Sequence, residues 1–313
     1  MTTTLRTITG TGEMLVASQL CSPVMNVELR HLRALAAIGD EGTITGAAAF
    51  LHVTQSALSR TLVQLESRLG VRLVERSTRH LALTEAGQRL WERAHQLLNQ
   101  LDDALAEAKS GPRPLRVGFA WATLGASTVP LLQGWRDAHP DIPARVHRRD
   151  DPEAALRRAE VDVAFLRTPP PDEPGFHALP LLRERRLAAV AESDPLAGAE
   201  TLRLADLADR PVARCVTAAT TTAGLWPRER RPHTFDVANV DEWLTVIATG
   251  EAVGVTSEGT RHSHPYPGIR YIPVSDVDPV TVHLVWPRVP THSATDAFRA
   301  HVQRSVRAAA PTP

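Results

Sequence analysis

The leucines between residues 58 and 69 recur every three or four positions, which is the spacing of one face of an α-helix. Thr54 precedes this run and is a good N-cap, while Gly70 follows it and suits the end of a helix. The pattern therefore predicts an amphipathic helix whose leucine face is buried. The opposite side presents mostly short polar or basic side chains. They are Gln55 in the first turn, and Ser56, Ser59, Arg60, Val63 and Ser67 along the outer face.

Two further helices are expected before this one. Apolar positions over 29–38 predict a first helix that Gly39 and Gly42 end. A second helix contains the alanines 47–49, whose small side chains allow two helices to cross closely. Residues 52–53 then form the short turn before the amphipathic helix. This order is that of a helix-turn-helix preceded by a supporting helix.

A hairpin is expected after the amphipathic helix. Apolar and polar residues alternate over 71–73 and again over 81–83, on either side of the charged segment 75–80. This pattern predicts a two-stranded wing with a basic tip, from which Arg79 would face a minor groove or a phosphate. Residues 26–84 are therefore predicted to be a winged helix-turn-helix domain that binds DNA.

The chemistry of the exposed helix face agrees with this prediction. Glutamine can bond adenine through two atoms, and arginine can bond guanine or a phosphate. The chain as a whole has a formal net charge of zero. Between residues 28 and 80, however, seven arginines stand against five acidic residues. This local surplus is modest, so useful affinity for DNA would require a dimer that doubles it.

A long helix is predicted over 85–110, with Thr84 as its cap. Its apolar residues form one stripe over about five turns. They include Leu90, Ala94, Leu97, Leu101 and Leu105. Such a stripe could pack on its own domain, but a helix of this length between two globular parts favours pairing with the same helix of a second chain. That pairing would set two recognition helices into successive major grooves. The segment 110–114, Ser-Gly-Pro-Arg-Pro, should then break the helix.

Residues 114–310 predict an α/β domain of two lobes, because strand-like and helix-like segments alternate as in a parallel sheet with crossovers. Strands are expected at 115–119, 144–149, 161–166, 187–190, 212–216, 253–256, 269–274 and 280–286, and helices at 129–138, 153–159, 241–249 and 294–306. A proline-rich surface loop is expected at 168–175. The first lobe would comprise about 114–186 and 287–310, and the second about 187–286.

A cleft between two such lobes would lie at the carboxyl ends of the strands. Several polar residues are expected there, together with the loop Trp121-Ala122-Thr123 and with Asp150. The candidates for binding a small molecule are Ala122, Thr123, Ser127, Thr128, Asp151, Thr217 and Thr256. Hydroxyls and free N–H groups in such a place could hold a carboxylate. Serine and threonine at helix starts are also ordinary caps, so each hydroxyl has a purely structural alternative.

The segment AAAFLHVTQSALSRTLVQLESRLGVRLVERSTRHLALTEAG resembles the DNA-binding region of LysR-type transcriptional regulators. The resemblance implies that Gln55, Ser56, Ser59 and Arg60 contact DNA from the recognition helix and that Arg79 does so from the wing. Val74 departs from the family, which usually has Phe there, and this change concerns the packing of the wing. The family pattern begins directly after Met25, so residues 1–25 are expected to be a disordered extension, and translation could start at Met1 or Met25.

The rest of the chain resembles the family's effector domain, which is itself similar to periplasmic solute-binding proteins. The pieces LRVGF, DAHPDI, VDVAFLR, ATGEAVGVT and VTVHLVW carry this looser resemblance. The family's linker helix pairs two chains, which implies the same for 85–110. Relatives with carboxylate effectors often have Ser where this chain has Ala122, so the resemblance leaves the class of effector open.

Other kinds of chemistry are weakly represented. The two cysteines, Cys21 and Cys215, suit a reducing cytoplasm better than a disulfide framework. His262-Ser263-His264 is expected in a loop rather than in a zinc site. Neither a membrane span nor a secretion signal is recognisable, and no nucleophile elbow, phosphate-binding loop or dinucleotide fingerprint appears. We therefore expect no enzyme, no metal and no cofactor.

Together these patterns predict a cytoplasmic, sequence-specific DNA-binding regulator. It would respond to a small-molecule effector bound between its lobes and act as a homodimer or homotetramer on double-stranded DNA, with RNA polymerase as a further partner and no membrane. The alternative is a two-lobed solute-binding or enzymatic protein without regulatory DNA binding. The helix-turn-helix pattern distinguishes the two.

Overall fold

The computed structural model describes residues 27–76, 81–168, 175–218 and 220–309. Its first elements are three helices. They are α1 (Leu29–Glu41), α2 (Ile44–Phe50) and α3 (Gln55–Leu69). Each is capped by local groups. Thr43 and Thr54 accept hydrogen bonds from Gly46 N and Ala57 N at the starts of α2 and α3, and Gly42 and Gly70 are left-handed after α1 and α3.

A short hairpin and a long helix follow. Strands β1 (Val74–Arg76) and β2 (Leu81–Leu83) pair antiparallel. The tip between them, with Arg79, lies outside the described residues. Helix α4 (Glu85–Ser110) begins with Thr84 Oγ1 accepting from Gly87 N at 3.0 Å, as the sequence predicts. Gly111, with a φ of 78°, ends it.

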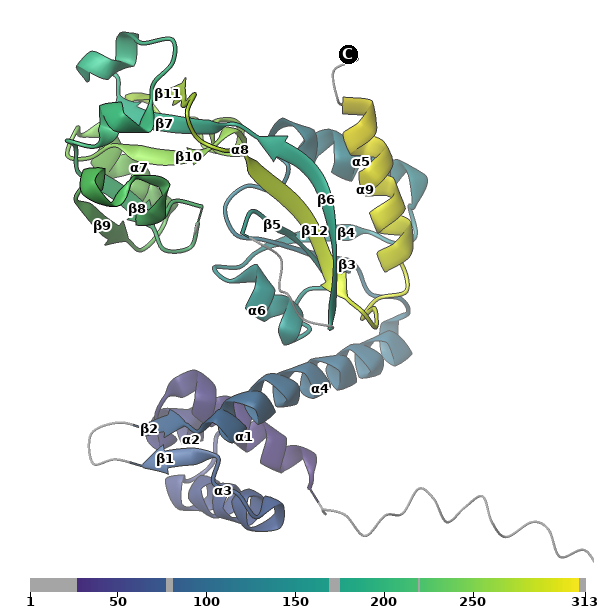
Figure 1. The fold of residues 1–313 in the computed structure, drawn as a ribbon. Helices are drawn as coiled ribbons and strands as arrows, with labels where there is room; N and C mark the ends of the chain where they lie inside the picture. Colours follow the sequence, from purple (N-terminus) through teal and green to yellow (C-terminus); the bar gives the residue numbers. More distant parts are fainter. Residues whose placement is uncertain (1–26, 77–80, 169–174, 219, 310–313) are drawn as a thin grey trace, which may run out of the picture. The chain divides into compact units, whose positions relative to one another are not determined.

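The chain divides into two compact units, Met1–Leu98 and Asn99–Pro313, so that α4 starts in one and ends in the other. In the first unit α1, α2 and α3 pack around one core (Figure 1). Gly39 lies inside α1, although the sequence suggests that it ends the helix. Its missing side chain makes room for Trp91 of α4, whose indole donates to Ala36 O and Asp40.

The first lobe of the second unit is built on a five-stranded sheet. Its order is β4 (Ala144–Arg148), β3 (Leu115–Phe119), β5 (Val163–Leu166), β12 (Val280–Pro287) and β6 (Phe176–Glu184). Helices α5 (Thr128–Ala138), α6 (Pro152–Arg157) and α9 (Thr295–Ala309) pack on it. Trp135 and Phe298 fill the core between α5, α9 and the sheet.

The second lobe contains two smaller sheets (Figure 1). One has the order β10 (Gly254–Ser257), β7 (Arg186–Ala191) and β11 (Ile269–Pro273), and the other pairs β8 (Val212–Cys215) with β9 (Thr234–Val237). Helices α7 (Val240–Ala248) and α8 (Glu258–Ser263) belong to this lobe. Short 3-10 turns are η1 (Gly125–Ser127), η2 (Pro195–Gly198), η3 (Leu204–Leu207), η4 (Ala223–Leu225) and η5 (Arg228–Arg230).

The structure corrects three expectations about the second unit. The first-lobe sheet is mixed rather than parallel, because β12 runs antiparallel to both β5 and β6. Strand β6 was not expected from the sequence at all. Residues 280–286, which the sequence assigns to the second lobe, form β12 in the first-lobe sheet, so the chain returns to that lobe earlier than position 287.

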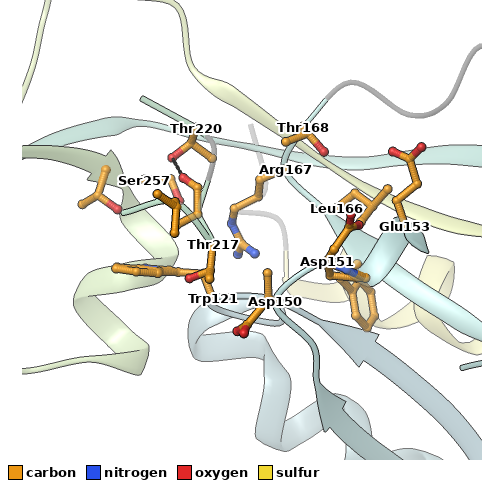
Figure 2. A pocket seen from close by; sticks show the side chains of 16 residues that line it. Trp121, Asp150, Asp151, Glu153, Leu166, Arg167, Thr168, Thr217, Thr220 and Ser257 are labelled. Atoms are coloured by element: carbon orange, nitrogen blue, oxygen red, sulfur yellow. Dashed lines mark hydrogen bonds between the residues drawn. The ribbon is translucent and has the colours of Figure 1, made fainter. Parts of the chain in front are cut away.

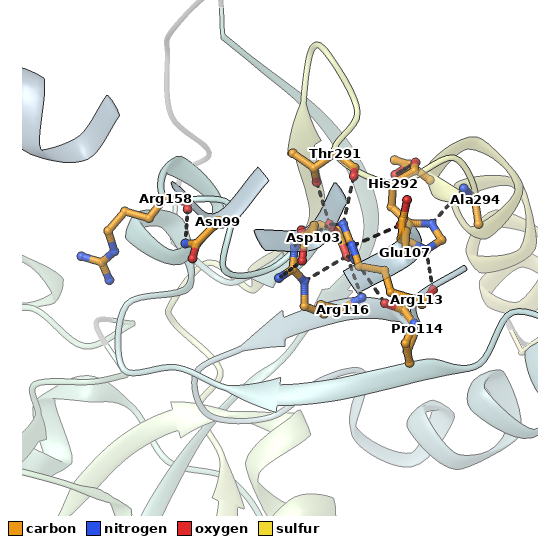
Figure 3. A network of polar contacts seen from close by, with 12 residues as sticks. Asn99, Asp103, Glu107, Arg113, Pro114, Arg116, Arg158, Thr291, His292 and Ala294 are labelled. Atoms are coloured by element: carbon orange, nitrogen blue, oxygen red, sulfur yellow. Dashed lines mark hydrogen bonds and ion pairs between the residues drawn. The ribbon is translucent and has the colours of Figure 1, made fainter. Parts of the chain in front are cut away.

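The last turns of α4 are tied to the first lobe by charged side chains (Figure 3). Asp103 bonds Arg116 at 2.7 Å and Arg113 at 3.2 Å, and both arginines also bond the fully buried Asp162. Asn99 donates to the carbonyl oxygen of Arg158 at 2.7 Å. The part of α4 that belongs to the second unit is thus held by the two arginines that follow it and by the distant backbone at Arg158.

Candidate functional site

Helix α3 has the two faces that its sequence predicts. Leu58, Leu62 and Leu65 are buried among α1, α2 and the wing. On the outer side Gln55, Ser56 and Arg60 are exposed and Ser59 is half-buried. Arg60 Nε donates to Ser56 O at 3.3 Å, which lays the arginine stem along the helix and leaves its Nη atoms outside this bond. The face therefore offers an amide, hydroxyls and a guanidinium to a partner.

The wing is fixed to this helix by Glu66. Its Oε1 accepts from Leu73 N at 2.8 Å and from Val74 N at 3.2 Å, directly before and at the start of β1. Val74 is buried in the core that α3 shares with the wing. A bulky Phe is thus not needed to bury this position. These two hydrogen bonds join α3 directly to the backbone at the base of the wing.

The apolar stripe of α4 has a buried part and an accessible part. Leu90 packs into the core of the first unit, and Ala94 is fully buried within one chain, so neither is free to pair with a second chain. Leu97 and Leu105 are 52% and 51% exposed, and Leu101 is half-buried. Of the five residues expected at a dimer interface, Leu97, Leu101 and Leu105 therefore remain accessible in a single chain.

A cavity of about 350 Å³ lies in the second unit, between residues of both lobes. Carboxylates, hydroxyls and one guanidinium line it together with apolar side chains. The lining residues are Ala120, Trp121, Asp150, Asp151, Pro152, Glu153, Phe165, Leu166, Arg167, Thr168, Val216, Thr217, Ala218, Thr220, Thr256 and Ser257. Figure 2 shows Arg167 with Thr217 on one side and Asp151 on the other. The volume suits a small metabolite.

Three of the seven residues expected in the cleft line this cavity, namely Asp151, Thr217 and Thr256. Ala122 and Thr123 are buried beside it, and their carbonyl oxygens accept hydrogen bonds from Arg167. Ser127 and Thr128 lie elsewhere. The Thr128 hydroxyl accepts from Leu124 N at 2.9 Å, which is a structural role but not the helix cap that the sequence offered as the alternative. Ser127 is the N-cap residue of α5 and makes no side-chain cap hydrogen bond.

Arg167 is the central charge of the site. It follows β5 and forms a two-pronged ion pair with Glu184 at the end of β6, with N–O distances of 2.7 and 2.8 Å. Ser257 donates to the same carboxylate at 2.5 Å. Burial alone would raise the pKa of Glu184, but the hydrogen bonds and charge of Arg167 and the Ser257 hydroxyl outweigh it and lower the pKa. Glu184 therefore remains ionised at neutral pH.

Trp121 connects the loop after β3 to the second lobe. Its indole Nε1 donates to Thr260 Oγ1 at 2.6 Å, and that hydroxyl is also 2.6 Å from Thr256 Oγ1. The ring packs edge-on against Trp243 of α7, with centroids 5.5 Å apart. One wall of the cavity is thus set by hydrogen bonds that cross between the lobes.

The sequence placed Trp121 and Asp150 in the expected cleft. It missed five polar residues of the lining, Glu153, Arg167, Thr168, Thr220 and Ser257. A usable signal existed for Arg167 and Thr168, because they are the first polar residues after the buried strand β5. Ser257 was hidden because it ends β10 and is itself buried.

The described residues offer little for other chemistry. No group of three or more His, Cys, Asp or Glu among them could hold a metal ion. His262 belongs to α8, and His264 bonds the carbonyl oxygen of Trp121 instead of lying in a free loop. Cys215 is a buried free thiol, and Cys21 lies outside the described residues. Over the same part of the chain, the helices are too short or too polar to cross a membrane.

A winged helix-turn-helix joined by a long helix to a two-lobed α/β domain with a polar cavity defines a ligand-responsive, DNA-binding regulator. Comparison with known proteins specifies the family. Residues 29–88 match the model of the bacterial regulatory helix-turn-helix protein, lysR family, and residues 108–307 match that of the LysR substrate binding domain. The chain belongs to the LysR family of transcriptional regulators.

Individual relatives agree with this assignment. The chain is 30% identical to the HTH-type transcriptional regulator YnfL of Escherichia coli (strain K12) over 301 residues, which covers 90% of this chain and 100% of the relative. It is 28% identical to BenM of Acinetobacter baylyi over 82% of this chain and 88% of BenM.

Solved structures show the same fold. That of CbnR, a LysR family regulator, has a TM-score of 0.62 at 22% identity and covers 90% of this chain and 99% of CbnR. Full-length CbnR complexed with its target DNA has a TM-score of 0.61 at 24% identity, over 89% of this chain and all of that one.

Proposed function

We propose that this regulator reads DNA with α3, through Gln55, Ser56, Ser59 and Arg60, and that Arg79 of the wing adds a contact. The observation that supports this most directly is the division of α3 into a buried leucine face and an exposed polar face. The exposed groups are those that bond base edges and phosphates. Glu66 would keep the wing at a fixed distance from these contacts.

Replacement of Arg60 tests this proposal. We expect Arg60→Ala to weaken binding to the native promoter by about 1–3 kcal/mol if the guanidinium contacts a base through two atoms. The measurement is a gel-shift titration with the full chain. Arg89→Ala removes an exposed arginine of α4 that pairs with Glu85, and it is the matched control. Equal affinities of the wild type and a folded Arg60→Ala variant would remove Arg60 from the interface.

The cavity of the second unit is the proposed effector site. Asp151, Thr217 and Thr256 would contact the ligand, together with Trp121 and Asp150. Ala122 and Thr123 would shape the site by holding Arg167, and Ser127 and Thr128 would act only in the fold. A ligand that binds one arrangement of the lobes better than another would shift the population of that arrangement and thereby change the DNA complex.

The remaining assignments concern the assembly and its place in the cell. We propose that α4 pairs two chains through Leu97, Leu101 and Leu105, in a homodimer that can assemble further into a homotetramer. Such a regulator would work in the cytoplasm, on double-stranded DNA and with RNA polymerase. Its relatives are named as transcriptional regulators, which supports a role that requires no reaction catalysed by the chain itself.

A further inference from the structure

The charges around the effector cavity are the basis for an inference about its ligand. Among the described residues that line the cavity there are three carboxylates and one cationic side chain, Arg167. A carboxylate ligand needs an available cation or several free N–H donors, whereas an ammonium ion needs oxygen acceptors. The availability of each charged group therefore indicates which class of ligand the cavity can hold.

Arg167 is already engaged. Its Nε and Nη2 donate to the two oxygens of Glu184, Nη2 also donates to Thr123 O, and Nη1 donates to Ala122 O. These contacts use most of the five N–H donors of the guanidinium, and Glu184 neutralises its charge at close range. The side chains of this ion pair are both only 7% exposed. A ligand carboxylate would have to compete with a buried partner that is already in place.

The carboxylates that line the cavity are, as a group, less closely paired with opposite charge than Arg167 is. Glu153 pairs with Arg157 at 2.5 Å, but the nearest ion pair of Asp150 is to Arg148 at 3.9 Å. Asp151 Oδ1 accepts from Ala154 N at 2.9 Å as the cap of α6, and this neutral contact leaves the charge of Asp151 in place. The start of α6 is thereby filled by the protein's own carboxylate. Asp150 and Asp151 therefore give their side of the cavity a negative charge.

The remaining lining also suits an organic cation. The hydroxyls of Thr217 and Thr220 are further acceptors, and Thr220 Oγ1 uses its own hydrogen on Ala218 O. Trp121 contributes an aromatic surface at the cavity, and such surfaces attract cations. We propose that the effector is a small organic cation, an amine or guanidine of metabolite size, whose charged end lies against Asp150 and Asp151.

This inference rests on the proposed use of the cavity as the effector site. Its test is isothermal titration of the full chain with four-carbon probes that differ only in their ends: 1,4-diaminobutane, 1,4-butanediol and succinate, with agmatine as the guanidine-bearing probe. We expect the two cations to bind, with affinity that falls as NaCl rises from about 0.05 M to about 0.5 M, and the diol and succinate to give no binding.

A charge-neutralised variant locates the binding. Asp150→Asn combined with Asp151→Asn should lower the affinity for the cation at least about tenfold. Asn at position 151 can still cap α6, so the fold is preserved. Asp137→Asn is the matched control, because Asp137 is 75% exposed and Asp150 is 76% exposed, but Asp137 does not line the cavity. It should bind the cation as the wild type does.

Three results would overturn the inference: preferential binding of succinate, no binding of either cation, or unchanged cation affinity in the double variant. They differ in their meaning for the proposed function. Succinate binding that is lost in Thr217→Val or Thr256→Val would keep the cavity as the effector site and change only the ligand class. The promoter titration with Arg60→Ala is independent of all three, so it separates failure of this inference from failure of the DNA-binding proposal.

Discussion

Asp162 joins three segments of the second unit that are distant along the chain. Its fully buried carboxylate accepts from both Nη atoms of Arg113 at 2.7 Å, from Arg116 N at 2.8 Å and from the Thr291 hydroxyl at 2.7 Å. Burial by itself would raise the pKa of Asp162, but the bonds from Arg113 and the charge of Arg116 lower it far below its ordinary value. The negative charge is therefore stabilised by folding.

At this residue scale we expect Asp162→Asn to destabilise the full chain by about 3 kcal/mol at pH 7, because two arginines lose their buried counter-charge. Since the folded pKa is depressed, the stabilisation is complete above the unfolded value near about 4 and is lost as the pH falls through the folded pKa. The difference between variant and wild type should thus be constant from neutral pH down to about 5 and shrink only in stronger acid. Denaturant titrations at several pH values measure it, with the exposed Asp137→Asn as control. A difference that vanishes already between pH 7 and about 5 would contradict the role of Asp162.

At the scale of elements, the start of α4 is fitted closely against the wing. The carbonyl oxygen of Leu73 accepts from Thr84 N at 2.9 Å, and the Thr84 hydroxyl caps the helix at Gly87 N. A Cβ at position 87 would overlap the Leu73 carbonyl oxygen and come within 2.9 Å of its carbon. Gly87 thus allows the helix to approach the backbone that leads into β1.

Replacing Gly87 by alanine has two opposing effects on stability. Alanine favours a helix over glycine by about 1 kcal/mol, but an overlap with backbone atoms costs about 1–3 kcal/mol and cannot be relieved by a side-chain rotation. We expect Gly87→Ala to lower the stability of the first unit and with it the affinity for DNA, as thermal unfolding and gel shifts would show. Gly198→Ala, where no atom lies within 4 Å of the added Cβ, should be neutral. A Gly87→Ala protein as stable as the wild type would mean that α4 can shift freely along the wing.

At the scale of the whole molecule, the proposed function requires that two chains join. A single winged helix-turn-helix domain contacts one half of a DNA site and binds it weakly. A two-fold dimer contacts both halves and combines their binding energies. Helix α4 leaves Leu97 and Leu105 about half exposed, on the stripe that also contains Leu101. Exposed leucines of this kind on one helix favour a helical partner over water.

We therefore expect Leu97→Asp combined with Leu105→Asp to give monomers in sedimentation velocity, because four carboxylates would meet at the helix seam. The fold of the single chain should survive, since both side chains are half exposed within it. Val289→Asp alters a still more exposed apolar residue that is not part of α4, and it should leave the assembly unchanged. If the double variant remained dimeric, α4 would not be the pairing element.

The sequence by itself determined the elements whose signals are local. The caps Thr43, Thr54 and Thr84 and the stops Gly42 and Gly70 act on groups within a few residues, so helix boundaries followed from them. The buried and exposed faces of α3 followed equally from its period. Helix α3, the base of the wing and most of the strands and helices could therefore be predicted, but β6, β9 and α8 could not.

Tertiary structure alone decided what depends on pairing between distant residues. Strand β6 escaped prediction because its burial is irregular and it contains Pro180, which an edge strand tolerates. The lobe to which β12 belongs was set by its partners β5 and β6, and the availability of Arg167 by Glu184, seventeen positions away. A ligand meets the charge of a side chain together with the charge of its partner. Only the folded chain therefore showed which charges at the cavity are already paired.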